Sequence, residues 1–258
     1  MDNKDLNDNL RVSTMTLVSG LDTSIDLQKL YENLSINDYI KYIECGKNPV
    51  KGEKVKKVKK PRKKKEKKFF YNQITFHIFH EKIVNTKLFN NGKIQMTGLK
   101  SKNQGNTIVK ILLDEINKLS DDKKELILDN LNPTIKESRT AMINSDFDVG
   151  YKVNREILHR IIINERYYSS FEPSIYPGVN IKYYFNTVGN NNGICKCSHV
   201  CDGKGKNGCC KKITVAVFNS GCIIITGAQS YEHLNTAYNF INKVLVENKE
   251  KLLKKEKE

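Results

Sequence analysis

Long hydrophobic runs are missing from this sequence of 258 residues, and their absence excludes whole classes of protein. The longest apolar stretches, such as Ile223-Ile224-Ile225, fall far short of the roughly 20 residues that a bilayer span needs. The opening MDNKDLNDNL is acidic and polar, which is unlike a signal peptide. We therefore expect a soluble protein that is neither secreted nor bound to a membrane.

The residue patterns of an active site are also missing. The sequence has no cluster of carboxylates, no glycine-rich loop of the kind that holds a phosphate, and no paired nucleophile and base. We therefore assign no catalytic residue and do not expect an enzyme. With 38% hydrophobic residues, however, the chain can bury a core, in one large domain or in two small ones.

Basic residues are abundant but unevenly spread. The formal net charge is +15, and residues 51–68 carry twelve Lys or Arg against two Glu. A run of this kind is either a solvated insertion, a nuclear-targeting patch, or a segment that binds phosphates without sequence specificity through counterion release. The net charge by itself therefore does not identify a nucleic-acid-binding surface.

Cysteine is concentrated in one place. Five of the seven cysteines lie within sixteen residues, in the spacing C-x-C-x3-C-x7-C-C, which is typical of metal binding in a reducing compartment. Four thiolates close a tetrahedral zinc site, and this loop has almost no apolar residues to hold a shape without such a clip. We expect a structural zinc ion, with disulfides or free thiols as the alternative. Five residues are candidates for the four places: Cys195, Cys197, Cys201, Cys209 and Cys210.

An internal repeat organises the sequence. The pattern Phe-x-x-Gly-x-Ile-x-x-Thr-Gly occurs at residues 89–98 and again at residues 218–227. Each copy predicts a hairpin, because Asn-Asn-Gly and Asn-Ser-Gly tolerate the positive φ of a tight turn between two strands. A helical pattern follows each copy, and another strand and helix precede it. The repeated unit is therefore a strand, a helix, several strands and a long helix.

This duplicated unit predicts an α+β fold. The helices of each unit cover one face of a sheet and leave the other face open, and duplication gives a longer, curved sheet with approximate two-fold symmetry. An open sheet face of this kind needs a partner. The expected segments are an N-terminal tail (1–9), a first repeat (10–118) with a basic insertion at about 46–68, a connection (119–139), a second repeat (140–247) with a cysteine-rich insertion at about 186–212, and a charged C-terminal tail (248–258).

Three features together resemble the TATA-box-binding protein family. They are the doubled hairpin pattern, the stretch from Ser169 to Gly178, and the opening Val12-Ser13-Thr14. The resemblance covers about residues 10–118 and 140–247, and the departures are similar to those of large-DNA-virus members. It implies a pseudo-two-fold saddle, a curved antiparallel sheet with helices on its convex face. It also implies that the concave face lies in a widened minor groove and that apolar wedges kink the DNA, a mechanism of which this family is itself the standard example.

The second hairpin carries apolar residues on both faces. Alternation along the strands assigns them as follows: Ala216, Phe218, Ile224 and Thr226 to one face, and Val215, Val217, Ile223 and Ile225 to the other. A strand that is apolar on both faces is normally buried on both. The resemblance implies that DNA buries the face that the helices leave open.

The resemblance also implies which residues contact DNA. The family has one pair of intercalating aromatic residues in each repeat, and Phe89 and Phe218 match one member of each pair. Tyr176 matches the second member in repeat two, and Phe70 or Tyr71 is the candidate in repeat one, where the insertion blurs the alignment. An isolated strand aromatic is more often a core residue, but the two Phe residues recur at repeated positions. The other expected contacts are Val12, Ile143, Thr97, Thr226, Ile224, Ala216, Lys87 and Gln95.

Several positions depart from the family pattern. On the first strand of each repeat, Leu10 and Ala141 stand where the family has an asparagine that donates to minor-groove acceptors, and Val12 and Ile143 follow two residues later. Lys87 and Gln95 stand where the family is apolar. We therefore expect a preference for A·T-rich DNA that depends on shape and deformability rather than strict TATA reading. The alternative is a degenerate saddle that binds DNA non-specifically or serves as a protein-interaction scaffold.

Protein partners are also implied by the resemblance. The family docks the next initiation factor through acidic residues of the loop that contains Glu172, and its second acidic position is Ser174 here. The resemblance implies a general initiation factor that recruits a factor IIB-like protein and the RNA polymerase machinery to an A·T-rich promoter. It is expected to act in the nucleus or in a cytoplasmic viral factory of the host cell.

Overall fold

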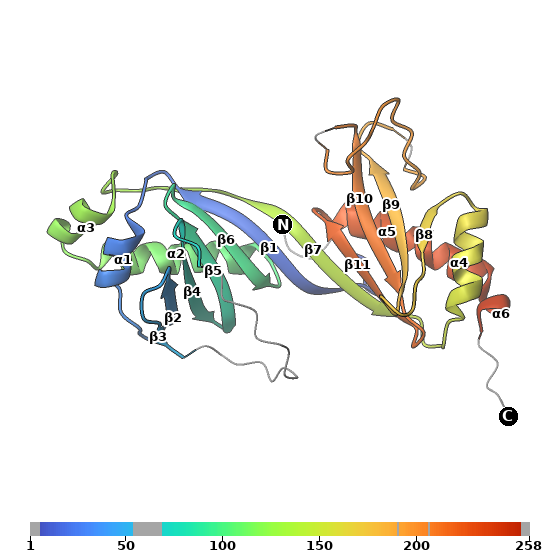
Figure 1. The fold of residues 1–258 in the computed structure, drawn as a ribbon, viewed down its shortest axis with the longest axis horizontal. Helices are drawn as coiled ribbons and strands as arrows, with labels where there is room; N and C mark the ends of the chain where they lie inside the picture. The colour runs from blue at the N-terminus through green and yellow to red at the C-terminus, as the bar shows by residue number, and fades with distance from the viewer. Residues whose placement is uncertain (1–5, 54–68, 190, 206, 254–258) are drawn as a thin grey trace. The chain divides into compact units, whose positions relative to one another are not determined.

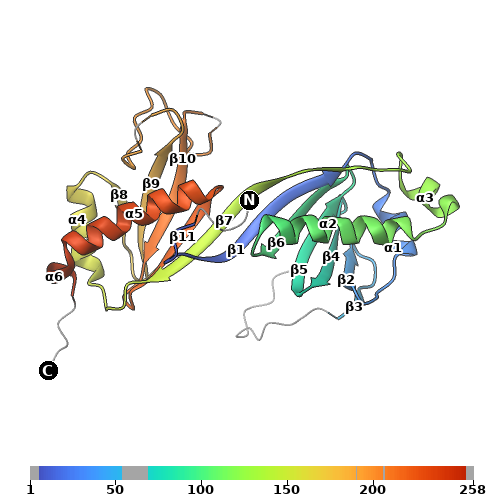
Figure 2. The ribbon, with the colours of Figure 1, turned by 180° about the vertical axis from the view of Figure 1, so that it is seen from behind.

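The computed structural model describes residues 6–53, 69–189, 191–205 and 207–253, and the chain forms two compact units (Figures 1 and 2). The first unit is Met15–Ala141, and the second unit combines Met1–Thr14 with Met142–Glu258. Most of the basic insertion expected at 46–68 lies outside the described residues. Within the described ranges, no helix is both long and apolar enough to cross a membrane.

The first unit is built on an antiparallel sheet. In chain order its elements are β1 (Arg11–Leu21), α1 (Leu27–Asn33), β2 (Ile40–Cys45), β3 (Lys51–Gly52), β4 (Gln73–His80), β5 (Lys82–Phe89), β6 (Lys93–Leu99), α2 (Lys102–Asn117) and α3 (Asp121–Ile127). The strand order is β3-β2-β4-β5-β6-β1, with antiparallel neighbours throughout. Helix α2 lies behind these strands in Figure 1 and in front of them in Figure 2, so it covers one face of the sheet.

The second unit repeats this arrangement. Its elements are β7 (Ile135–Asp148), α4 (Arg155–Asn164), β8 (Tyr168–Ser170), β9 (Val179–Asn186), β10 (Cys210–Val217), β11 (Cys222–Ala228), α5 (Tyr231–Glu247) and α6 (Lys249–Leu252). The strand order is β8-β9-β10-β11-β7, which matches β2-β4-β5-β6-β1 of the first unit strand by strand. The predicted sequence of strand, helix, several strands and long helix is therefore found in both units.

The two predicted hairpins are confirmed by the strand pairing. Strand β5 pairs with β6, and β10 pairs with β11. Gly92 and Gly221 occupy the turns with φ of +76° and +97°, in the region that favours glycine. A Cβ on Gly92 would also collide with the carbonyl oxygens of Leu21 and Thr23, so no other residue fits there without a backbone shift.

Two serines begin the long helices. The Ser101 hydroxyl accepts a hydrogen bond from the Gln104 N–H at 3.1 Å, and the Ser230 hydroxyl accepts one from the His233 N–H at 3.2 Å. Both serines have extended backbones, so each satisfies one of the unpaired N–H groups of a first helical turn. Because each serine follows a copy of the repeated pattern by three residues, α2 and α5 begin at equivalent positions of the two units.

Helix α5 covers one face of the second sheet. Phe147 of β7 and Tyr238 of α5 pack edge to face with their ring centroids 4.8 Å apart. The hairpin residues that share this face with Phe147 are fully buried: Val215, Val217, Ile223 and Ile225. The side chains that a partner can reach on this sheet therefore lie on its opposite face.

Candidate nucleic-acid interface

We call the face of each sheet opposite its long helix the open face. In the second unit, Ala216 lies opposite Ile224, and Thr226 follows Ile224 on the same side of β11. Ile224 and Thr226 are half-buried, whereas their strand neighbours Ile223 and Ile225 are fully buried. The predicted division of the second hairpin into two faces is confirmed, and it leaves a strip of apolar and hydroxyl side chains on the open face.

Two predicted aromatic residues meet at the end of this strip. The rings of Tyr176 and Phe218 have centroids 5.8 Å apart and planes inclined by 63°, an edge-to-face arrangement. Gly178 lies against both rings, since a Cβ there would be 3.0 Å from Tyr176 and 3.2 Å from Phe218. Tyr176 is 40% exposed, so the structure places an accessible aromatic pair beside the open face of the second unit.

The open face of the first unit is more polar. Lys87 lies opposite Gln95, and Asn85 lies opposite Thr97. Phe89 follows Lys87 on the same side of β5, and all five side chains are half-buried. Their neighbours on the α2 side are fully buried: Leu88, Ile94 and Met96. The structure therefore brings four predicted DNA contacts, Phe89, Lys87, Gln95 and Thr97, to one face.

A hollow of about 220 Å³ lies on the open face of the first unit. Phe70, Lys87 and Glu44 are among the residues that line it. Tyr71 lies next to it against Gly46, where an added Cβ would be 3.3 Å from the Tyr71 ring. Of the two candidates for the fourth aromatic residue, Phe70 therefore shares a surface with another predicted contact, and its side chain is 58% exposed.

Two predicted contacts lie elsewhere. Val12 and Ile143 are buried, with exposed fractions of 7% and 2%. Ile143 lies opposite Ala228, and Met15 lies opposite Leu99, each beside an irregularity in the strand pairing. Ile143 therefore corresponds to Met15, and the predicted correspondence with Val12 is wrong by three residues. The same offset applies to Leu10 and Ala141, so these two residues do not occupy equivalent positions in the two units.

Two lysines that the sequence analysis missed also lie on the open face of the second unit. Lys182 lies opposite Thr214, and its Nζ donates to the Thr214 hydroxyl at 2.9 Å. Lys212 lies two residues before Thr214 on the same side of β10. Burial, and then repulsion from Lys212, lower the pKa of Lys182, as expected for two neighbouring cations. Because side chains alternate along a strand, Lys212 is predicted from the sequence to share a face with Phe218.

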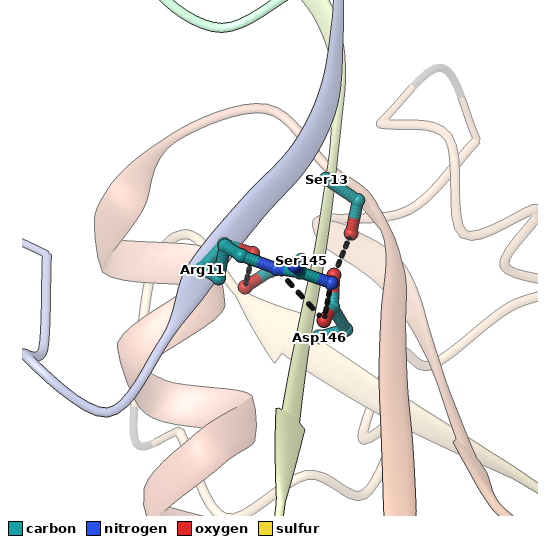
Figure 3. A network of polar contacts seen from close by, with 4 residues as sticks. All are labelled: Arg11, Ser13, Ser145 and Asp146. Atoms are coloured by element: carbon teal, nitrogen blue, oxygen red, sulfur yellow. Dashed lines mark hydrogen bonds and ion pairs between the residues drawn. The ribbon is translucent and has the colours of Figure 1, made fainter.

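A polar network lies where β1 runs beside β7 in the second unit (Figure 3). Nη2 and Nε of Arg11 lie 2.6 and 3.1 Å from Oδ2 of Asp146, and the Ser13 hydroxyl donates to Oδ1. The Ser145 hydroxyl donates to the Arg11 carbonyl at 2.9 Å. Asp146 lies opposite Ile224, so its carboxylate is on the open face. This pair has no local signal in the sequence, because its members are 135 positions apart.

The loop that contains Glu172 is closed by its own polar contacts. The Glu172 carboxylate accepts from the Ser174 hydroxyl at 2.7 Å, and its backbone carbonyl accepts from the Ile175 N–H at 3.0 Å. Arg155 of α4 holds the start of the loop, with its guanidinium 5.1 Å from the centre of the Phe171 ring. Ile175 is left 84% exposed at the tip. The loop thus presents the Glu172 carboxylate and the apolar side chain of Ile175 to solvent.

Four thiols converge in the cysteine-rich insertion. Their Sγ atoms all lie within 4.8 Å of one another: Cys195, Cys197, Cys201 and Cys210. Cys210 lies 3.7 Å from Cys197 and 3.8 Å from Cys195 between Sγ atoms, nearly twice the length of a disulfide of about 2.05 Å, so these thiols are free. Cys209 stands outside the group. Its N–H donates to the Cys197 sulfur at 3.4 Å and its Sγ lies 3.5 Å from that sulfur, and these two contacts are the main causes that lower the pKa of Cys197 to about 6.

This thiol cluster is attached to the sheet. Cys210 is the buried first residue of β10 and lies opposite Asn186, the last residue of β9. Gly208 allows the loop to approach the sulfurs, because its φ is +87° and an added Cβ would lie 2.7 Å from Cys201 Sγ. Four sulfur donors at these separations could hold a metal ion, and thiolate sets of this kind suit zinc.

Known proteins are similar to this chain in sequence and in fold. A family model described as "Transcription factor TFIID (or TATA-binding protein, TBP)" matches residues 143–248. A curated protein of Acanthamoeba polyphaga mimivirus, named TATA-box-binding protein-like, is 31% identical over 261 residues, which covers 94% of this chain and 66% of that protein. The solved structure of Methanococcus jannaschii TBP matches with a TM-score of 0.54 and 18% identity, over 94% of this chain and 99% of that chain. The similarity therefore extends over both units.

Proposed function

Because this chain belongs to the TATA-box-binding protein family, we propose that it is a transcription initiation factor that binds promoter DNA through the minor groove and bends it. The observation that carries this proposal is the open face of each hairpin, a strip of half-buried side chains opposite a face that a long helix covers. The family and its fold belong to non-enzymatic DNA-binding factors, and the proposal includes no catalytic step.

The aromatic residues supply the bending step in this proposal. Tyr176 and Phe218 form an apolar pair beside the second hairpin, and Phe89 begins the turn of the first hairpin. An apolar side chain inserted between base pairs unstacks them and kinks the duplex. The cost of unstacking is offset by the protein surface that bent DNA covers, which here includes Ile224 and Thr226.

Sequence preference in this proposal comes from deformability and a small set of polar contacts. The minor groove distinguishes A·T from G·C poorly, because A·T and T·A present the same acceptors. Thr97 and Thr226 place hydroxyl groups on the open faces, and Lys182 and Lys212 add positive charge for phosphates. We therefore propose a preference for A·T-rich promoters that contain TA steps, because TA steps are easily kinked.

A bending assay tests the proposal. Fluorescence transfer across end-labelled duplexes reports the bend, and A·T-rich and G·C-rich duplexes of equal length are compared. Phe89→Ala and Phe218→Ala are expected to reduce both the bend and the affinity. Leu126→Ala on α3 and Val246→Ala on α5 remove side chains that are 60% and 65% exposed on helices, and they serve as controls. The wedge role is wrong if the two Phe variants bend DNA like the controls.

The polar open face of the first unit supports a second candidate function. The open face that contacts a minor groove is expected to be apolar, but in the first unit it carries Lys87, Gln95 and Glu44. A saddle of this kind could bind DNA non-specifically or act as a protein scaffold. The same assay separates the two functions, since this alternative predicts equal affinity for A·T-rich and G·C-rich duplexes and no bend in either.

The Glu172 loop is the proposed docking site for a factor IIB-like protein, which in turn recruits the RNA polymerase machinery in the nucleus or a viral factory. The loop is held by its own hydrogen bonds, and it presents the Glu172 carboxylate beside the exposed Ile175. Glu172→Gln is expected to weaken binding of a purified IIB-like factor to the protein–DNA complex without changing the bend. Ser174→Ala is the control for loss of the internal hydrogen bond.

We also propose that the cysteine cluster holds one structural zinc ion, with Cys195, Cys197, Cys201 and Cys210 as ligands. Cys209 is the matched control because it is adjacent to a ligand but stands outside the group. Elemental analysis of purified protein is expected to find one zinc per chain in the wild type and in Cys209→Ser, and less in Cys210→Ser. Zinc that is absent from the wild type, or lost in Cys209→Ser and kept in Cys210→Ser, contradicts this ligand set.

A further inference from the structure

Arg11 is exposed but held in one orientation. Its side chain is 77% exposed, whereas that of Asp146 is 19% exposed, so the carboxylate anchors a guanidinium that reaches into solvent. Two nitrogens of Arg11 bond to a single carboxylate oxygen, and the Ser13 hydroxyl holds the other oxygen. The carboxylate therefore cannot rotate freely, and the plane of the guanidinium is defined by it.

The side of the sheet on which this arginine lies is determined by the strand register. Asp146 lies opposite Ile224, and the neighbouring Phe147 packs on Tyr238 of α5, on the covered face. The Arg11 guanidinium is therefore on the open face, next to the strip that contains Ile224. Leu10, by contrast, is only 6% exposed. Leu10 is thus turned inward, and the next residue along the chain is a donor that is turned outward.

The unused donors of Arg11 determine what it can bind. A guanidinium has five N–H donors and no acceptor, and Asp146 takes only those on Nε and part of Nη2. Asp146 also cancels most of the local positive charge, which weakens attraction to phosphates relative to that of a free arginine. The remaining N–H groups suit uncharged acceptors, and the floor of an A·T minor groove presents adenine N3 and thymine O2.

From this geometry we infer that Arg11 is the base-reading donor of this protein, with Asp146 as its positioning residue. The inference rests on the proposed minor-groove function. Because the donor is oriented before DNA binds, little side-chain freedom is lost on contact.

The test uses binding to A·T-rich duplexes in which single adenines are replaced in turn by 3-deazaadenine, which lacks the N3 acceptor. The wild type is expected to lose affinity at one position of the site. Arg11→Ala is expected to lose roughly 5- to 150-fold on the unmodified duplex, the range for one good base contact, and to show no further loss at that position. Arg160→Ala, which removes an exposed arginine from α4, is the control for charge alone.

The outcomes separate this inference from the proposed function. If the wild type neither binds nor bends the unmodified duplex, the proposed function fails. If the wild type bends it and Arg11→Ala binds equally well, only the inference fails. A uniform loss in Arg11→Ala that Arg11→Lys restores, with no sensitive adenine, also overturns it, because that pattern identifies a phosphate contact.

Asp146→Asn tests the positioning role. It keeps the shape of the side chain and removes the charge that holds Arg11. It is expected to weaken binding when Arg11 is present and to have no effect in the Arg11→Ala background, since the two residues act as one unit. If Asp146→Asn instead strengthens binding in both backgrounds, the carboxylate only repels DNA, and the positioning role is refuted. Unchanged thermal unfolding of each variant shows that the fold is intact.

Discussion

Replacement of Gly178 by alanine is expected to separate DNA bending from folding stability. The added Cβ would lie 3.0 Å from Tyr176 and 3.2 Å from Phe218, closer than ordinary contact, so the two rings must move apart by a few tenths of an ångström. An edge-to-face pair contributes about 0.5–1.5 kcal/mol to the folded protein, so separating the rings costs stability, and it also moves the proposed wedge from the position in which it meets DNA. The φ of Gly178 is not positive, so alanine fits the backbone and restricts the unfolded chain, which adds about 0.4–1 kcal/mol of stability.

The two contributions to stability nearly cancel, whereas the displacement of the rings is not compensated in DNA binding. Gly178→Ala is therefore expected to unfold at about the same urea concentration as the wild type, while it bends the labelled duplex less and binds it more weakly. Gly189→Ala is the matched control, because its added Cβ meets nothing closer than 3.8 Å and its φ is not positive. Undiminished bending by Gly178→Ala would show that the Tyr176 and Phe218 pair is not the wedge. Joint loss of stability and bending would show that Gly178 is a folding residue instead.

Three further predictions concern the hairpins, pH and salt. Gly221→Ala is expected to lower the free energy of unfolding, measured in urea, by roughly 1–3 kcal/mol more than Gly150→Ala does. Both glycines have a positive φ, but only at Gly221 would the added Cβ meet backbone, at the Tyr151 carbonyl. Equal losses of stability in the two variants contradict this. Burial lowers the pKa of His233 below 6.5, so the unfolded chain binds a proton that the folded chain does not, and stability is expected to fall as pH drops below 6.5. His233→Gln should flatten that slope in unfolding measured from pH 5 to 8, and an unchanged slope assigns it to other groups. Lys182→Ala is expected to weaken binding to all duplexes alike and to lower the slope of log K against log salt by about 0.9, the value for one lost phosphate contact; an unchanged slope excludes that contact.

The hairpins and helix starts could be predicted from the sequence because residues a few positions apart determine them. Gly92 and Gly221 are required by the φ of their turns, and Ser101 and Ser230 by the first N–H groups of the helices. The alternation of side chains along β10 and β11 also predicts which hairpin residues share a face, and α5 covers one of these two faces. Each of these is a local property, and the internal repeat made it visible twice.

Other parts of the interface depend on contacts between distant residues, and the sequence could not show them. The irregularities that place Ile143 opposite Ala228 leave no mark in the motif spacing. The exclusion of Cys209 from the thiol group depends on how the loop folds, since Cys209 and Cys210 are adjacent and the spacing does not show which of them is a ligand. The link between Arg11 and Asp146 spans 135 positions, so neither residue has a local signal of its role.

The division of the chain into units has a consequence for its synthesis. Met1–Thr14 belong to the second unit, where the Asn7 N–H donates to the Asn235 side chain at 3.0 Å and the Asn9 amide donates to the Tyr238 hydroxyl at 3.1 Å. These partners are 228 and 229 positions apart, so Asn7 and Asn9 are synthesised long before α5 and can dock only after α5 has formed. Co-translational folding can therefore complete the first unit but not the second. A fragment that starts at Met142 lacks its closing segment, whereas a circular permutant with residues 1–14 appended after the C-terminus keeps that unit contiguous.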